Sequence, residues 1–195
     1  MSHKSRAKSN SQAKSGNIRI IAGKYRGRKL TVLDVEGLRP TTDRVKETVF
    51  NWLMPYITDA KCLDCFAGSG GLGFEALSRG AEQVTFLELN KKAAQQLKLN
   101  LQTLKAPNGE VINTDSLQYL NSITQQVDLV FIDPPFRQNL LTDTINKLSQ
   151  GWLAANALIY IEAESEANIT NLPENWQLLK EKIAGQVAYR LYQNN

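Results

Sequence analysis

Histidine is almost missing from this chain of 195 residues, and its scarcity removes several kinds of chemistry. The single histidine, His3, lies in a stretch rich in Ser, Lys, Asn and Gln that is typical of a disordered tail. A Ser-His-Asp triad, a histidine general base in the core and a histidine-ligated metal are therefore excluded. Catalysis by this chain has to depend on other side chains, and we expect no metal.

Cysteine is scarce too, and the two cysteines of the chain, Cys62 and Cys65, form a C-x-x-C pair. Positions i and i+3 of a strand point to opposite faces, so we expect no disulfide between them. They are predicted to be buried apolar residues of a protein in a reducing compartment.

Long apolar runs are also absent. No segment approaches the roughly 18 apolar residues that a membrane-spanning helix needs. No apolar stretch follows the charged N-terminus as it would in a secretory signal. We therefore expect a cytoplasmic protein without membrane contact, long enough for one sizeable hydrophobic core.

Acidic residues are missing from the front of the chain. Residues 1–30 hold nine Lys and Arg and no Asp or Glu, whereas the remainder holds fourteen basic and nineteen acidic residues. Such asymmetry often marks a nucleic-acid contact, although a basic tail can also serve only to keep a protein in solution. We expect residues 1–16 to be a disordered tail. Residues 17–33 predict a β-hairpin, with two β-prone runs on either side of Gly23 and Gly27.

The remaining sequence alternates between helix and strand patterns. Thr42 is a suitable cap for a helix with Val45, Val49, Trp52 and Leu53 on one face. Further helical faces are predicted at positions 93, 94, 97, 101 and 104, at 117, 120 and 123, and at 141, 145 and 148. Strands are predicted at residues 61–66, 83–89, 110–113, 127–132 and 157–162.

Repeated strand-helix units imply an α/β fold, with a mostly parallel sheet that carries helices on both faces. The last part of the chain departs from this pattern. Residues 177–183 and 186–192 are two β-prone runs joined by Ala184 and Gly185, and they predict an antiparallel hairpin.

A glycine motif marks the first candidate site. Gly68, Gly70 and Gly73 form G-x-G-x-x-G after a predicted strand and at the start of a helix, where a ligand can approach free backbone N–H groups. Glu88 lies eighteen residues beyond Gly70, at the end of the next strand, where an acid can accept the hydroxyls of a ribose. These features indicate a nucleotide-containing cofactor, and NAD fits them as well as any other.

The segment Asp133-Pro134-Pro135-Phe136 decides between the cofactors. It follows the apolar run 127–132, so it lies where a parallel strand ends and where ligands of α/β sheets bind. An exocyclic base amine is a poor nucleophile because its lone pair is delocalised into the ring. The Asp133 carboxylate and the Pro134 carbonyl can hold both N–H groups and direct the lone pair at an electrophile, while Phe136 stacks on the base. Hydride transfer needs no such arrangement.

These motifs resemble those of the class I S-adenosylmethionine-dependent methyltransferases. Four segments in order are similar to the RsmD family, the bacterial 16S ribosomal RNA (guanine(966)-N(2))-methyltransferases, over about residues 17–193. The segments are residues 39–44, 64–70, 133–136 and 185–190.

The resemblance implies a Rossmann-like fold with a seven-stranded, mostly parallel sheet. After the basic tail 1–16, which the resemblance does not cover, it implies an RNA-binding hairpin over 17–38 and a methyltransferase domain over 39–195. A monomer is expected, with S-adenosylmethionine as cofactor and 16S rRNA, within a small ribosomal subunit or its assembly intermediate, as substrate.

Site residues are carried over from the same resemblance. Asp133, Pro134 and Phe136 would hold the guanine. The hairpin would bind RNA phosphates through Arg19, Lys24, Arg26, Arg28 and Lys29. The cofactor would contact Arg39, Thr41, Thr42, Asp64, Phe66, Gly68, Ser69, Gly70, Glu88, Leu89, Asp115 and Ser116.

Within that set, the segment from Arg39 to Thr42 would close over the amino-acid end of the cofactor. Asp64 would lie near its amino group and Glu88 at its ribose, while Asp115 would face the adenine amine with Ser116 beside it.

Three alternatives remain open from the sequence. The same chemistry acts on DNA, at adenine N6 or cytosine N4, although 195 residues leave little room for a target-recognition region. A nicotinamide-dependent oxidoreductase and an inactive RNA-binding assembly factor are the other two.

Overall fold

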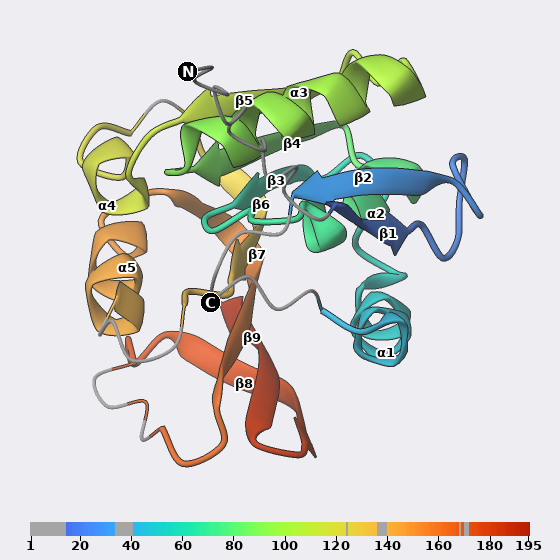
Figure 1. Cartoon of the computed structure of the whole chain (residues 1–195). Coiled ribbons are helices and arrows are strands. Elements are labelled where there is room, and N and C mark those ends of the chain that lie inside the picture. The colour runs from blue at the N-terminus through green and yellow to red at the C-terminus, as the bar shows by residue number, and fades with distance from the viewer. Residues whose placement is uncertain (1–14, 34–40, 124, 136–139, 168, 170–171) are drawn as a thin grey trace, which may run out of the picture.

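A single seven-stranded sheet forms the centre of the protein (Figure 1). The structure is a computed structural model that describes residues 15–33, 41–123, 125–135, 140–167, 169 and 172–195. The five strands from β5 to β7 run parallel, and β9 runs antiparallel to both of its neighbours, as the sequence predicts. Across the sheet the order is β5 (Gly109–Asn113), β4 (Gln83–Glu88), β3 (Lys61–Asp64), β6 (Val127–Ile132), β7 (Leu153–Glu164), β9 (Val187–Asn194) and β8 (Trp176–Ala184).

Helices cover both faces of this sheet (Figure 1). On one face lie α1 (Asp43–Leu53), α2 (Gly71–Ser78) and α3 (Lys91–Leu104), and on the other lie α4 (Ser116–Tyr119) and α5 (Leu140–Leu148). Two apolar clusters fill the spaces between sheet and helices. Cys62 belongs to one cluster and Cys65 to the other, and both are buried and free, so the prediction for this pair is confirmed. None of the described helices is long and apolar enough to cross a membrane.

The helix signals of the sequence are confirmed at α1 and α3. The hydroxyl of Thr42 accepts the N–H of Val45 and caps α1. Asn90 caps α3 by accepting the N–H groups of Lys92 and Ala93. The predicted apolar face of α3 is buried throughout.

Three predicted boundaries are wrong. The helix predicted over Leu117, Leu120 and Ile123 is only the four-residue α4, and Ile123 is 51% exposed. Strand β7 begins at Leu153 rather than 157, because Trp152 and Leu153 enter the core before the β-prone run starts. The first strand begins at Ser15, inside the segment predicted as tail, because it pairs with the far end of the next strand.

The N-terminal hairpin consists of β1 (Ser15–Arg19) and β2 (Lys29–Leu33), paired antiparallel as predicted. Alternation of side chains buries Ile18, Leu30 and Val32 against the body of the protein and leaves the residues between them exposed. The hairpin is therefore part of the same core as α1, α2 and α3.

Buried polar groups of α2 hold the connection between β1 and β2. The carboxylate of Glu75, whose side chain is fully buried, accepts the N–H groups of Ile21 and Ala22 at 2.8 and 3.0 Å. Arg79 pairs with the same carboxylate at 2.8 Å. Gly23, with φ of +81°, passes so close to α2 that a Cβ there would lie 1.9 Å from the carbonyl oxygen of Ser78. The connection is therefore fixed to the helix by specific bonds and close contact.

Lys46 of α1 holds the same segment from the other side. Its Nζ donates to the carbonyl of Arg19 at 2.6 Å and lies 3.2 Å from Asp43, and the side chain is only 2% exposed. Lys46 precedes Val49, Phe50 and Leu53 by three, four and seven residues, so it lies on the apolar face of α1. A buried cation and a buried anion thus bind neighbouring peptide groups of the hairpin.

Replacement of Glu75 should test this anchoring. Glu75→Ala leaves two N–H groups and Arg79 without their acceptor in a buried position, so we expect the free energy of unfolding to fall by about 3 kcal/mol. The control Glu82→Ala removes an exposed carboxylate from the next loop and should change it by less than about 0.5 kcal/mol. Denaturant unfolding measures both, and equal effects of the two substitutions would contradict the anchoring.

Candidate active site

The candidate site lies at the carboxyl ends of the parallel strands. From β3 the chain proceeds outward to β4 and β5, then returns to place β6 and β7 on the other side of β3. The connections after β3 and β6 therefore leave the sheet in opposite directions. A crevice at such a switch point is where α/β proteins bind their ligands.

The glycine loop after β3 forms one wall of this crevice. Gly68 and Gly70 have φ of +51° and +77°, and a Cβ at Gly70 would lie 2.4 Å from the ring of Phe74. Gly70 is the N-cap of α2 and offers no side chain to the first N–H groups of that helix. These donors and the positive end of the helix dipole suit a carboxylate of a ligand.

Asp64 ends β3 and lies beneath the loop, with only 2% of its surface exposed. Burial raises the pKa of this carboxyl to about 7, and the charge of Glu88 adds to the rise. Backbone N–H groups of Gly73 and Phe66 donate to Asp64 and oppose the shift. Asp64 therefore holds the loop over the end of β3, and its carboxyl group loses its proton near neutral pH.

Glu88 ends β4 and joins the two loops of the site. Its Oε2 accepts the N–H of Gly68 at 2.8 Å and its Oε1 accepts the N–H of Asn90 at 2.7 Å. The pKa of Glu88 is raised, mainly by partial burial. Leu89 beside it is 69% exposed and offers an apolar surface at the edge of the site.

Asp115 and Ser116 are the cap and the first residue of α4, and they lie at the same edge of the sheet. Asp115 caps the helix, because its Oδ1 accepts the N–H of Gln118 at 2.9 Å. Buried Ser116 donates its hydroxyl to the carbonyl of Cys65, which precedes Phe66 in the loop after β3. Phe66 itself is partly buried against the core. The structure thus brings the segments after β3, β4 and β5 together, as the motifs predict.

Asp133 follows β6 directly and is half-buried, while Pro134 is buried. The register pairs Ile132 with Ile161, so Asp133 comes next to Glu162 of β7. Burial raises the pKa of Asp133 well above its usual value, and the charges of Glu162 and Asp64 raise it further.

The hydroxyl of buried Tyr160 donates to Glu162 at 2.9 Å. Burial and the neighbouring carboxylates of Glu162 and Asp133 raise the pKa of Tyr160 well above its usual value. Carboxylates thus follow four adjacent strands at one edge of the sheet.

The predicted cofactor residues all lie within the described part of the chain, with the exception of Arg39. Phe136, predicted to stack on the base, lies outside the described residues as well. Thr41 is half-buried, and Thr42 uses its hydroxyl to cap α1.

The predicted RNA-binding residues are all exposed, but most of them lie away from Asp133. Lys24 donates its N–H to the carbonyl of Ser78, at the end of α2 opposite the glycine loop. Eight helical residues separate these ends by about 12 Å. The structure therefore does not bring Lys24, Arg26 and Arg28 into the crevice; they extend the surface beyond it.

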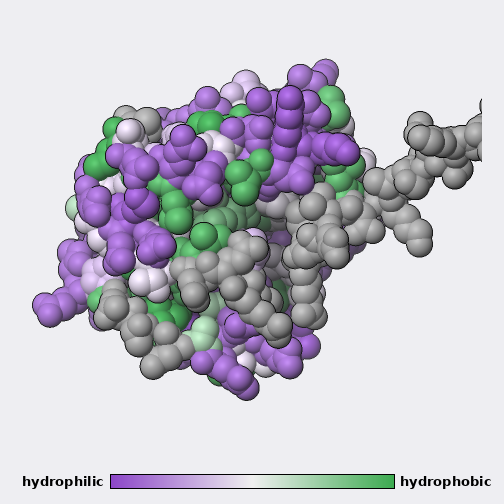
Figure 2. Space-filling view, turned by 60° about the vertical axis from the view of Figure 1, so that its left-hand side comes forward, coloured by the Kyte–Doolittle hydropathy of each residue, from purple (hydrophilic) through white to green (hydrophobic). Residues whose placement is uncertain are grey.

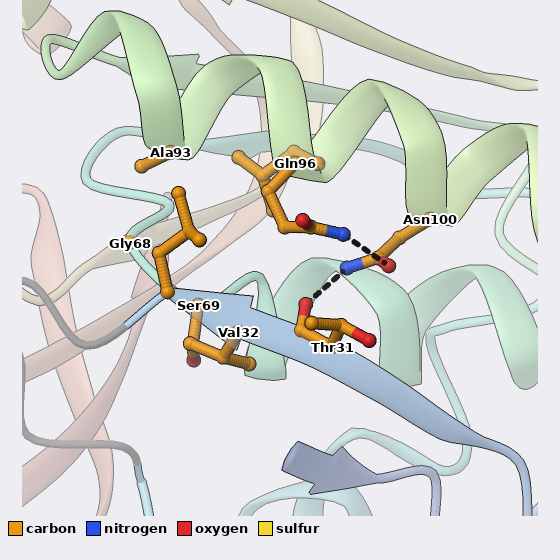
Figure 3. A pocket seen from close by; sticks show the side chains of 9 residues that line it. Thr31, Val32, Gly68, Ser69, Ala93, Gln96 and Asn100 are labelled. Atoms are coloured by element: carbon orange, nitrogen blue, oxygen red, sulfur yellow. Dashed lines mark hydrogen bonds between the residues drawn. The ribbon is translucent and has the colours of Figure 1, made fainter. Parts of the chain in front are cut away.

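A small pocket adjoins the glycine loop between β2 and α3 (Figure 3). Gln96 and Asn100 point from α3 toward β2, where Asn100 Nδ2 donates to the carbonyl of Thr31 at 2.9 Å. The cavity of about 10 Å³ has room for about one water molecule, and Asp133 does not line it. It belongs to the packing of the hairpin beside Gly68 and Ser69 rather than to the crevice of Asp133.

On the face shown in Figure 2, hydrophobic residues gather in the middle and hydrophilic ones surround them. Among the described residues, no group of His, Cys, Asp or Glu is arranged to hold a metal ion.

Sequence reasoning missed Lys46, Glu75 and Glu162. Lys46 carries a readable signal, because it interrupts the apolar face of α1. Glu75 carries the same signal in α2, where nearly every other side chain is apolar and buried. Glu162 ends a predicted strand just as Glu88 does, so the rule applied to Glu88 would have found it.

Comparison with known proteins identifies the fold and the family of the chain. The family described as "Conserved hypothetical protein 95" matches residues 18–193. A structure of yhhF from Escherichia coli has a TM-score of 0.86 and 56% identity, covering 92% of this chain and 99% of that one. A more distant structure solved with SAH has a TM-score of 0.69 and 15% identity, covering 96% of this chain and 58% of that one, and shares the fold. Fold and site define a Rossmann-like methyltransferase.

Two relatives identify the family within this class. Ribosomal RNA small subunit methyltransferase D of Escherichia coli (strain K12) is 58% identical over 92% of this chain and 91% of its own length. The protein of the same name from Haemophilus influenzae is 61% identical over 92% and 95%. The chain belongs to the ribosomal RNA small subunit methyltransferase D family, so the resemblance to the RsmD family is confirmed. S-adenosylmethionine, the cofactor predicted from the motifs, is the methyl donor of this class.

The residues present fit that cofactor. Its sulfonium and ammonium groups match the buried and half-buried carboxylates of Asp64 and Asp133, and its ribose matches Glu88. Its carboxylate matches the start of α2, where Gly70 offers no side-chain cap.

Substitution of Asp64 should separate stability from ligand binding. A carboxyl whose folded pKa is raised to about 7 binds more protons in the folded state, so stability falls as pH rises from about 4 to about 7. Asp64→Asn lacks this dependence, and we expect the variant to gain stability relative to the wild type as pH rises through that range. We also expect weaker binding of S-adenosylmethionine at pH 8.

Denaturant unfolding at several pH values and calorimetric titration measure the two effects. A constant difference in stability from pH 4 to 8 would show that Asp64 keeps an ordinary pKa. Unchanged affinity for the cofactor would remove its charge from the binding site.

Proposed function

We propose that this protein transfers a methyl group from S-adenosylmethionine to the exocyclic N2 amine of a guanine in 16S ribosomal RNA. The observation that carries the proposal is the position of Asp133 at the switch point, beside the loop of Asp64 and Gly68, in a chain of the ribosomal RNA small subunit methyltransferase D family. The family supports the ribosomal RNA of the small subunit as substrate. The acid-Pro-Pro-aromatic segment supports a base amine as the acceptor.

The carboxylate of Asp133 holds and polarises the amine. It accepts one N–H of the base, and the carbonyl of Pro134 accepts the other, so that the nitrogen lone pair leaves the plane of the ring. The same carboxylate stabilises the positive charge that develops on nitrogen as the new bond forms. The cofactor, when bound, would supply a methyl group bonded to a positively charged sulfur. Loss of the methyl group would leave this sulfur in a neutral thioether. Transfer would then be an in-line displacement in which the N–C bond forms as the C–S bond breaks, with no metal and no covalent intermediate on the enzyme. The methylated nitrogen would afterwards release one proton to water.

The negative potential of the edge favours cationic groups. Asp64, Glu88, Asp133 and Glu162 follow four adjacent strands, and burial raises the pKa of the first three. Each pKa rise measures how unfavourable the charge is without a cation nearby. A cationic ligand therefore relieves the repulsion at this edge, and its binding favours the ionised form of Asp133.

The target guanine has to leave its helix before it can react. Its amine is engaged when the base is paired, and the half-buried position of Asp133 requires the base to enter the crevice. A loop nucleotide, or one extruded from a helix, satisfies this condition. Exposed basic residues of the hairpin then hold the flanking phosphates.

Substitution of Asp133 is the direct test of mechanism. We expect Asp133→Asn to lower turnover on 16S rRNA by about 100-fold or more, because the variant has no charge to stabilise the transition state. Affinity for S-adenosylmethionine should fall much less than turnover, because Asp64 and Glu88 stay in place. The matched control is Asp128→Asn, which alters the exposed acid near the opposite end of β6 and keeps an acceptor for the N–H of Lys61.

Transfer of a labelled methyl group gives the rates. Small ribosomal subunits from cells that lack this protein and duplex DNA serve as substrates side by side. Mass mapping of the modified nucleosides identifies the methylated atom. Methylation of DNA in preference to the subunits, or near-normal turnover of the Asp133 variant, would overturn the proposal.

The hairpin gives a second test. Replacement of Arg26, Arg28 and Lys29 by Ala should weaken RNA binding, because these side chains neutralise phosphates and release counterions. The slope of log affinity against log salt should become shallower by about 0.7 for each phosphate that the variant no longer neutralises. A filter-binding series over several salt concentrations measures the slope. The same slope for variant and wild type would give these residues a structural role only.

A further inference from the structure

Glu162 is an acid at the edge of the site that makes no contact in the mechanism proposed above. That mechanism needs one carboxylate at the amine, and Asp133 supplies it. The acids that match the cofactor follow β3, β4 and β5, whereas Glu162 belongs to β7, which lies on the far side of β6. Glu162 is therefore next to Asp133 on the side away from the cofactor, and this side is left for the acceptor base.

Glu162 and Asp133 lie on the same face of the sheet. Phe131 of β6 pairs with Tyr160 of β7 in the parallel register, and their rings contact edge to face with centroids 6.1 Å apart. Side chains two residues farther along each strand point to the same face, so Asp133 and Glu162 come together beyond this pair. Both are half-buried. Burial raises the pKa of Asp133, and the nearby charge of Glu162 raises it further.

Buried aromatic residues fix the position of Glu162. The hydroxyl of Tyr160, whose side chain is fully buried, donates to Oε2 of Glu162 at 2.9 Å. On the other side, buried Tyr189 of β9 is the register partner of Glu162, and Trp52 of α1 packs on its ring with centroids 5.5 Å apart. A carboxylate has about four acceptor sites, so the bond from Tyr160 leaves Glu162 able to accept further donors.

Among the bases that carry an exocyclic amine, guanine is distinguished by a second donor beside that amine. Its Watson–Crick edge presents N1–H next to the N2 amine. Adenine has an acceptor at N1 beside its N6 amine, and cytosine has an acceptor at N3 beside its N4 amine. An ionised carboxylate accepts hydrogen bonds and donates none. Two neighbouring carboxylates therefore match the edge of guanine and repel the edges of adenine and cytosine.

We propose that Glu162 accepts the N1–H of the target guanine and thereby selects guanine over adenine and cytosine. Asp133 accepts the N–H of the amine on the N1 side, and the carbonyl of Pro134 accepts the other N–H. This assignment rests on the function proposed above and adds the residue that identifies the base. Tyr160 is a positioning residue, because it acts through Glu162 and does not touch the base.

The expected selectivity follows from the cost of an unmatched carboxylate. A site that is built to hydrogen-bond an N–H of its substrate strongly rejects an analogue without that N–H, because the polar group of the site is left unpaired. One hydrogen bond to a charged group corresponds to a factor of about 10 to 150 in binding. A base without N1–H should therefore react much more slowly even if it keeps its amine.

The analogue 2-aminopurine tests this contact from the side of the substrate. It keeps the exocyclic N2 amine and has an acceptor in place of N1–H. The probes are 16S rRNA molecules with guanine or 2-aminopurine at the methylated position, made by ligation and reconstituted into small ribosomal subunits. We expect the wild type to methylate guanine with a kcat/KM about 100-fold higher, measured by transfer of a labelled methyl group.

Glu162→Gln tests the same contact from the side of the protein. The amide oxygen can still accept the hydroxyl of Tyr160, while the NH2 group can donate to N1 of 2-aminopurine. We expect kcat/KM on guanine to fall about 30-fold and the preference for guanine over 2-aminopurine to fall to about threefold. The control Glu174→Gln removes an exposed acid that precedes β8 and should keep the preference of the wild type.

Tyr160→Phe tests the positioning role. The variant keeps the ring against Phe131 and removes the hydroxyl that holds Glu162. We expect a preference for guanine between those of the wild type and the Glu162 variant, with affinity for S-adenosylmethionine unchanged by calorimetry. A preference equal to that of the wild type would remove Tyr160 from the selection.

Two results would overturn the role of Glu162. Equal kcat/KM of the wild type on the two bases would do so without any variant. A parallel loss on both bases in Glu162→Gln, with the preference unchanged, would leave Glu162 a structural role only. Failure of the wild type to methylate the guanine substrate would instead refute the proposed function, so the two failures are distinguishable.

Discussion

Burial of carboxylates at one edge of the sheet, with repulsion between some of them added, is the constraint on which the site depends. Parallel strands bring their carboxyl ends together, and here β4, β3, β6 and β7 each contribute an acid. Backbone N–H groups satisfy Asp64 and Glu88, yet burial still raises the pKa of both. The edge is thus organised for a cation before any cation arrives, and little rearrangement is needed when one binds.

The hairpin and the glycine loop are both attached to α2, so this helix connects the basic hairpin with the candidate site. The loop sets the start of α2, while Glu75 and Ser78 farther along the same helix bind the connection of the hairpin. Lys46 ties that connection to α1 as well. These buried and partly buried bonds attach the hairpin to the same core as the crevice, so the hairpin is not a loosely attached arm.

Local patterns predicted most of the fold and the position of the site. The cap at Thr42, the apolar face of α3 and the strand before Asp133 are all readable, because burial and hydrogen bonding at these points depend on near neighbours in sequence. Three spaced apolar residues predicted too long a helix at α4, because Ile123 has no core to enter. The two backbone N–H groups that Glu75 binds lie more than fifty residues away in the sequence, and no periodicity reveals such bonds.

The fixed attachment of the hairpin has a consequence for substrate choice. Under the proposed function, the hairpin would hold RNA phosphates at a set distance from Asp133. Only an RNA that presents an unpaired base at that distance from its bound phosphates would contact the hairpin and Asp133 at the same time. If that function holds, the distance between the two contacts would select one nucleotide among many, with few contacts to the bases around it.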